Sequence, residues 1–121
     1  MPHIVLNGDV DLEKIQGQFQ VILKKNPCII RLKEMYVSSS KKNALVHTLV
    51  IDQESQEFFI EVLASKGKTT IRLYPLTDPK KTDSVKISMV LLCDFIKKLY
   101  PDLPIGKTNL QDYLSKVSIS C

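Results

Sequence analysis

The sequence predicts an α+β fold in which a four-stranded antiparallel meander is preceded by one helix and followed by two helices. Between residues 28 and 76, four apolar segments rich in β-forming residues follow one another with only short polar connections, which favour antiparallel neighbours. On both sides of this stretch, apolar residues recur at spacings of three and four, which is typical of helices that bury one face. The 121 residues fit a single domain, residues 1–121, around one core.

The N-terminal part of the chain predicts a short strand and then a helix. The apolar run 3–6, which Asn7-Gly8 stops, could add a strand to an edge of the sheet. Over residues 9–25, one apolar stripe at helical spacing consists of Leu12, Ile15, Phe19 and Ile22. Asn26-Pro27 then ends the helix, because the residue before a proline avoids the helical conformation.

Four strands are expected to form the meander, at residues 28–37, 44–51, 58–64 and 69–74. In the first strand the alternation of apolar side chains changes phase at Lys33-Glu34, which predicts a β-bulge there. Pro75 ends the last strand, because proline has no N–H group to donate to the ladder.

Two helices are predicted after the sheet. Residues 82–84 offer N-caps for a helix that reaches Tyr100. The stripe expected to pack against the sheet consists of Val85, Met89, Leu92, Ile96 and Leu99. After a loop over residues 101–106, Thr108 and Gln111 fit a capping box at the start of a short terminal helix.

Both faces of the predicted sheet are apolar. One face is expected to hold Leu45, His47, Leu49, Ile51, Phe58, Ile60, Val62, Ile71 and Leu73. The other face would still hold Val46, Val50, Phe59, Leu63 and Tyr74. Neither face suits free exposure to water. Either the helices divide between the two faces, or they cover one and leave the other as an interface, which could join two copies of the chain as a homodimer.

The sequence carries no recognisable catalytic or metal-binding pattern. Residues 67–70 imitate the end of a phosphate-binding loop, but Val62 stands where that motif needs a glycine, and a strand follows instead of a helix. The two histidines and three cysteines lack the spacing of a metal site. Cys28 and Cys93 are expected to be small buried apolar side chains. We therefore expect no catalytic residue, no metal and no cofactor, and an enzyme is the least favoured function.

The charge balance permits an acidic partner without requiring one. The chain has 17 basic and 13 acidic residues, for a net charge of +4. All of the basic residues except Arg31 and Arg72 are lysines. Because arginine is the residue best suited to specific phosphate and base recognition, this composition weakens the case for sequence-specific nucleic-acid binding.

Four lysines are expected to gather at one end of the sheet. Lys41 and Lys42 lie in the connection between the first two strands, and Lys66 and Lys68 lie around the connection between the last two. Because successive antiparallel strands reverse direction, these two connections meet at the same end. We predict an anion-binding or partner-binding site there, and the alternative is a set of solvated loop lysines that keep the chain in solution. The opposite, acidic end is expected to hold Asp52, Glu54 and Glu57.

These observations favour a small non-catalytic protein-interaction module, an adaptor or complex subunit that presents a sheet face or edge to a protein partner. The alternative is a nucleic-acid or phosphate-ligand binding domain that uses the lysine-rich end through nonspecific, salt-sensitive contacts. The longest apolar run, residues 89–93, is too short to span a bilayer, and the N-terminus lacks a signal-peptide pattern. We therefore expect a cytoplasmic location and no membrane contact.

Overall fold

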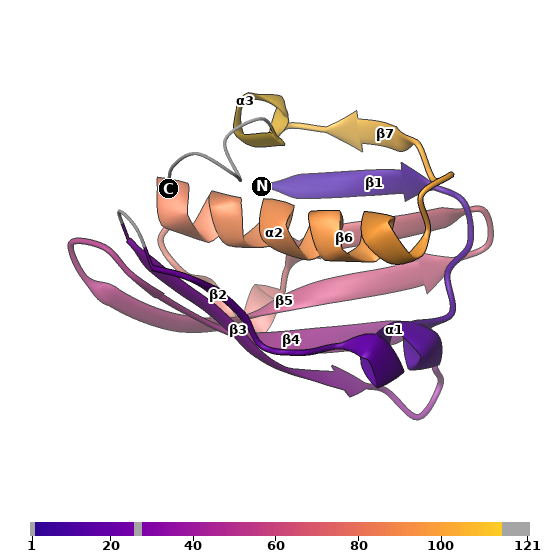
Figure 1. Ribbon diagram of the computed structural model, residues 1–121, viewed down its shortest axis with the longest axis horizontal. Coiled ribbons are helices and arrows are strands. Elements are labelled where there is room, and N and C mark those ends of the chain that lie inside the picture. The colour runs from indigo at the N-terminus through magenta and orange to yellow at the C-terminus, as the bar shows by residue number, and fades with distance from the viewer. Residues whose placement is uncertain (1, 26–27, 115–121) are drawn as a thin grey trace.

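A single antiparallel sheet, curled into a half-barrel, dominates the structure (Figure 1). The computed structural model describes residues 2–25 and 28–114. Within them, seven strands lie in the order β2-β3-β4-β5-β6-β1-β7. The strands are β1 His3–Asn7, β2 Ile22–Lys24, β3 Ile29–Val37, β4 Asn43–Ile51, β5 Ser55–Ser65, β6 Lys68–Leu73 and β7 Ile105–Thr108. The helices are α1 Leu12–Gln18, the 3₁₀ turn η1 Pro75–Thr77, α2 Asp83–Leu99 and α3 Gln111–Leu114.

The predicted four-stranded meander with one helix before it and two after it is wrong. Three short strands extend the sheet to seven, and two of them, β2 and β7, form where a helix and a loop were expected. The remaining short strand, β1, does not lie at an edge, because it pairs with both β6 and β7. Strands of three to five residues carry too little periodic pattern to be recognised, and the partners of β1 lie far away in the sequence.

The first helix is much shorter than its apolar stripe predicted. Asp11 caps α1, and its carboxylate accepts the backbone N–H of Glu13 at 3.0 Å. The helix ends before Phe19, whose backbone is extended and whose ring packs edge-on against Phe95 of α2 with centroids 5.6 Å apart. Ile22 then pairs with Leu32 in the sheet. The apolar residues at helical spacing over residues 9–25 therefore belong to two elements, α1 and β2, and to the link between them. All of these bury their apolar side chains in the same core.

Strands β3 to β6 pair in sequence order, each antiparallel to the next. The predicted β-bulge in β3 is confirmed by a shift of register between Leu32 and Glu34. The predicted faces of β4, however, are wrong. Val46 lies opposite Ile60, and His47 lies opposite Phe59, so it is Val46 and Val50 that join the buried face. Because β4 is apolar at both alternating sets of positions, its pattern could not indicate which set faces the core.

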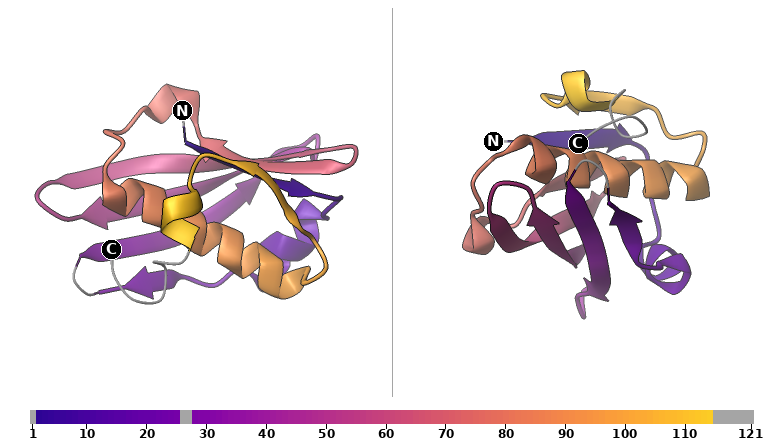
Figure 2. Two further views of the ribbon diagram at one scale, coloured as in Figure 1. Left: turned by 90° about the horizontal axis from the view of Figure 1, so that it is seen from above. Right: turned by 60° about the vertical axis from the view of Figure 1, so that its left-hand side comes forward.

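Helix α2 lies across the concave face of the sheet and forms the centre of the core (Figures 1 and 2). Thr82 caps its N-terminus by accepting the backbone N–H of Val85. The predicted packing of this stripe on the sheet is confirmed for Val85, Met89, Leu92 and Ile96, which are fully buried, while Leu99 is half-buried. The described α-helices leave the convex face of β2, β3 and β4 uncovered (Figure 2).

The two cysteines in the described part of the chain differ. Cys93 on α2 is a buried free thiol, as predicted, and burial raises its pKa to about 11. Cys28 is also buried, but its sulfur forms a disulfide, so the prediction of a simple buried thiol is wrong there. A thiol with such a raised pKa carries almost no thiolate near neutral pH, which makes Cys93 a packing residue.

Candidate interaction surfaces

The four predicted lysines lie at one end of the sheet. Lys41 and Lys42 are in the β3–β4 connection, Lys66 is in the β5–β6 turn, and Lys68 begins β6. The backbone N–H of Ala64, near the end of β5, donates to the carbonyl oxygen of Lys42 at 2.7 Å, which joins the β3–β4 connection to the end of β5. Binding of an anion at this lysine-rich end stays a prediction.

Two acidic side chains near α1 lie at the same end of the sheet. Glu13 pairs with Lys41 at 3.4 Å, and the carboxylate of Asp9 accepts the backbone N–H of Gly67 at 2.7 Å. The sequence did not indicate this arrangement, because both contacts join residues that are far apart in the chain. Their carboxylates offset part of the positive charge of the four lysines.

The acidic side chains at the predicted acidic end also form hydrogen bonds and ion pairs within the chain. Ser84 donates to the Asp52 carboxylate at 2.6 Å, and this hydrogen bond lowers the pKa of Asp52. Lys80 pairs with Glu54 at 2.9 Å. Glu57 contacts His47 at 2.8 Å, a hydrogen bond that is the main cause of its lowered pKa. The two ends of the sheet are therefore less contrasted in charge than the sequence predicted.

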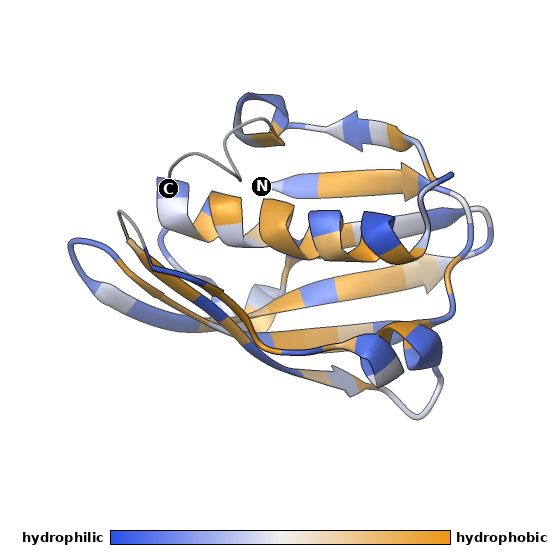
Figure 3. Ribbon diagram, viewed as in Figure 1, coloured by the Kyte–Doolittle hydropathy of each residue, from blue (hydrophilic) through white to orange (hydrophobic). Residues whose placement is uncertain are grey.

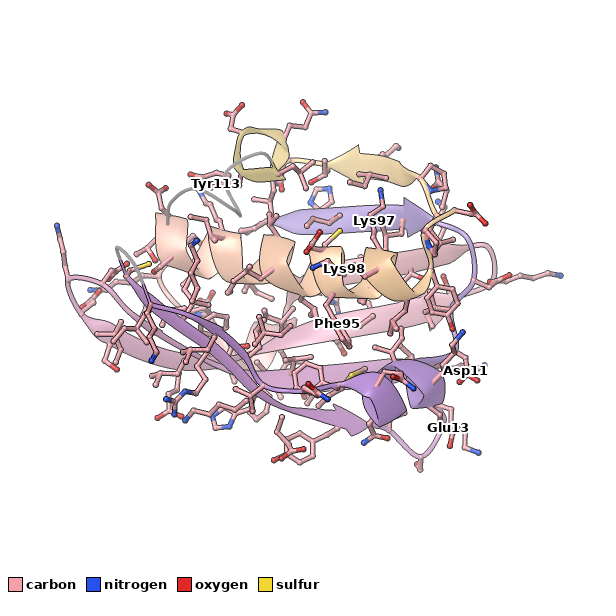
Figure 4. All side chains as sticks on the ribbon, in the orientation of Figure 1. Asp11, Glu13, Phe95, Lys97, Lys98 and Tyr113 are labelled. Atoms are coloured by element: carbon pink, nitrogen blue, oxygen red, sulfur yellow. The ribbon has the colours of Figure 1, made fainter. Side chains whose placement is uncertain are left out.

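The concave side is closed by contacts among the helices. Tyr100, at the end of α2, accepts the backbone N–H of Asp11 at 3.0 Å. Tyr113 on α3 donates to Asp83 at the start of α2 at 2.6 Å. Figure 4 labels Asp11 just before α1 and Tyr113 on α3, together with Phe95, Lys97 and Lys98 on α2. This side therefore offers packed helices and charged side chains.

The convex face, in contrast, exposes a cluster of apolar side chains over β2, β3 and β4. Leu23, Ile29 and Ile51 are 37% to 42% exposed, and Leu49 is half-buried between them. Val21 and Tyr36, at the margins, are more than half exposed. Figure 3 shows how far apolar residues extend along these strands. Of the six large apolar side chains exposed in the described residues, only Leu76 lies outside this region.

Arg31 occupies the middle of this cluster, which we call the open-face patch: Leu23, Ile29, Arg31, Leu49 and Ile51. In the sheet, Arg31 lies directly between Leu23 on β2 and Leu49 on β4. Ile29 and Ile51 form the next pair on the same face. The sequence did not indicate the patch, because the spacing of apolar residues predicted Leu23 in a helix and the two faces of β4 are equally apolar.

The other half of the convex face is filled by contacts within the chain. Glu61 on β5 is only 4% exposed. Its carboxylate accepts hydrogen bonds from the guanidinium of Arg72 at 2.8 Å and from the amide of Asn43 at 3.3 Å. The Phe59 ring packs between His47 and Tyr74, with centroids 5.3 Å and 6.5 Å away. Only the half over β2 to β4 therefore presents apolar side chains that the described residues leave exposed.

No known protein family, curated protein or solved structure matches the chain. Among residues 2–25 and 28–114, no three histidine, cysteine or acidic side chains gather closely enough to hold a metal ion. None of the helices in the same residues has the length and hydrophobicity needed to cross a lipid bilayer.

Proposed function

We propose that this chain is a non-catalytic protein-interaction module that binds a partner protein through the convex face of its sheet. The observation that carries the proposal is the open-face patch. Sheet faces that stay in water are usually polar at alternate positions, whereas this one presents apolar side chains on three adjacent strands. An apolar cluster of this kind is typical of surfaces that bind another protein.

Substitution of Ile29 by aspartate is expected to weaken partner binding at least about tenfold. The substitution removes an apolar contact from the patch, and its carboxylate would lie two residues from Arg31 on the same face, where it would compete with the partner for the guanidinium. Wild-type and variant chains would be used for affinity capture from extracts of the source cells. The captured protein would then be purified and its affinity for each chain measured by calorimetry.

Leu76→Asp is the matched control, because Leu76 is equally apolar and 82% exposed but lies in η1, outside the patch. We expect this variant to bind like the wild type, and thermal unfolding would verify that both variants fold. If Ile29→Asp binds the purified partner as tightly as Leu76→Asp does, the convex face is not the binding surface and the proposal fails.

The lysine-rich end is the second candidate, as a nucleic-acid or phosphate-ligand binding site. The observation in its favour is the hydrogen bond between the β3–β4 connection and the end of β5, at the end of the sheet where four lysines lie near Asp9 and Glu13. Loop lysines of this kind would bind a phosphate backbone through its charge, with strong dependence on salt.

Glutamine at all four lysines, Lys41, Lys42, Lys66 and Lys68, should weaken binding of a single-stranded RNA oligonucleotide and flatten its salt dependence. Fluorescence anisotropy at several salt concentrations would measure both effects. The control variant replaces Lys80, Lys81, Lys97 and Lys98, which carry the same charge elsewhere on the surface. Equal loss in the two variants, or no binding by the wild type, would show that the lysine-rich end is only a solvated surface.

A further inference from the structure

Arg31 is the one basic side chain on the convex face of β2 to β5 that has no hydrogen bond or ion pair within the described residues. Lys33 contacts Glu57 at 3.4 Å, and His47 contacts the same carboxylate at 2.8 Å. The other arginine of the chain, Arg72 on β6, is bound to Glu61. Arg31 thus leaves all its N–H donors to solvent.

The neighbours of Arg31 make this position unusual. Leu23 and Leu49 lie on either side of it across the sheet, and Ile29 precedes it on the same face of β3. A partner that covers these apolar side chains would also remove water from the guanidinium. Burial of an unpaired charge is costly, so a partner that fits this patch must supply an acceptor for Arg31. A carboxylate is the acceptor whose geometry matches the planar guanidinium.

Building on the proposed function, we propose that the open-face patch binds a segment of a partner protein in which an aspartate or glutamate is flanked by aliphatic or aromatic residues. The carboxylate binds Arg31, and the flanking side chains cover Leu23 and Leu49. The patch reaches the edge of the sheet, because β2 is the outermost strand. A partner segment can therefore reach the patch along the edge strand β2 as well as across the convex face.

Charge argues against a second copy of this chain as the occupant. A two-fold symmetric contact centred on the patch would bring two copies of Arg31 towards each other. Like charges that face each other in an interface oppose binding. The acidic residue beside the patch, Glu57, lies opposite Leu49, but its carboxylate already contacts His47 at 2.8 Å and Lys33 at 3.4 Å.

A random peptide library displayed on phage, selected on the wild-type chain, tests this inference. We expect the selected peptides to contain an acidic residue between apolar ones, and to lose binding to Ile29→Asp. For one such synthetic peptide, Arg31→Met should weaken binding at least about tenfold. Substitution of the peptide's acidic residue by its amide should weaken binding to the wild type by a similar factor but leave binding to Arg31→Met nearly unchanged. Arg31→Lys, which keeps the charge without the planar fork, should bind with intermediate affinity.

The outcomes separate this inference from the proposed function. Peptides that depend on Ile29 but show no preference for an acidic residue, or that bind Arg31→Met normally, would overturn the carboxylate inference and leave the convex face as a binding surface. Peptides that bind Ile29→Asp normally would argue against both. A wild-type chain that sediments as a dimer, while Ile29→Asp sediments as a monomer, would show that a second copy occupies the patch and would overturn the inference.

Discussion

Replacement of Leu92 by alanine is expected to lower the free energy of unfolding by about 2–5 kcal/mol. Leu92 is fully buried on the side of α2 that packs against the concave face of the sheet. The truncation removes apolar contacts and leaves a cavity that the surrounding strands cannot close, because α2 is held at both ends by capping and by hydrogen bonds of the Tyr100 and Tyr113 hydroxyls. Urea unfolding followed by circular dichroism measures the change.

The control for this prediction is Leu76→Ala, since that side chain is 82% exposed and should change the stability by less than about 0.5 kcal/mol. A loss below about 1 kcal/mol for Leu92→Ala would mean that α2 does not pack on the sheet as the structure shows.

Replacement of Arg72 by methionine is expected to cost about 2–4 kcal/mol, because it leaves the buried carboxylate of Glu61 without its cation. The loss should fall short of that for a fully buried pair, since the Arg72 side chain is 37% exposed. The amide of Asn43 stays within 3.3 Å of Glu61, but one neutral donor cannot replace a guanidinium. Urea unfolding near neutral pH would measure the loss.

A second substitution tests the cause. In Arg72→Met with Glu61→Gln the uncompensated charge is gone, so most of the lost stability should return. If the double variant is as unstable as Arg72→Met alone, the cost comes from lost packing of the arginine side chain, and the explanation by an unpaired carboxylate is wrong.

The sequence predicted best those elements that are long and strictly periodic. The α2 stripe is confirmed, and it was predictable because its spacing repeats over many residues. The bulge of β3 is confirmed as well, and it was predictable because it interrupts a clear alternation of apolar side chains. Of the three short strands that complete the sheet, only β1 was anticipated, and it was expected at an edge. Strand β2 was not predicted because its three residues lie within a helical spacing of apolar side chains. Strand β7 was not predicted, and β1 was misplaced, because the two strands pair with each other across the length of the chain: Ile4 lies opposite Thr108. Such pairing has no local signal.

The candidate sites, like the fold, were predictable only where the sequence carries a local signal. Antiparallel geometry was enough to bring the two lysine connections to one end, but not to reveal that Glu13 reaches Lys41. The open-face patch required two facts that the sequence does not contain, namely the strand at Leu23 and the face on which Leu49 lies. The one sequence signal for the patch was an arginine between Ile30 and Leu32 in a predicted strand. Its significance depends on Leu23 and Leu49, the neighbours that the sequence did not indicate.

The position of β1 between β6 and β7 constrains the order in which the chain can assemble. Ile4 needs Ile71 on one side and Thr108 on the other, so both of its partners are synthesised long after it. Strands β2 to β6 can pair as each leaves the ribosome, because every one of them finds its neighbour next in the chain. Before β6 has been synthesised, β1 has no strand to pair with. Its pairing with β6 must also close the long loop formed by the chain between these two strands, which costs conformational entropy. We therefore expect β1, which is synthesised before the other strands, to be among the last to pair in the sheet.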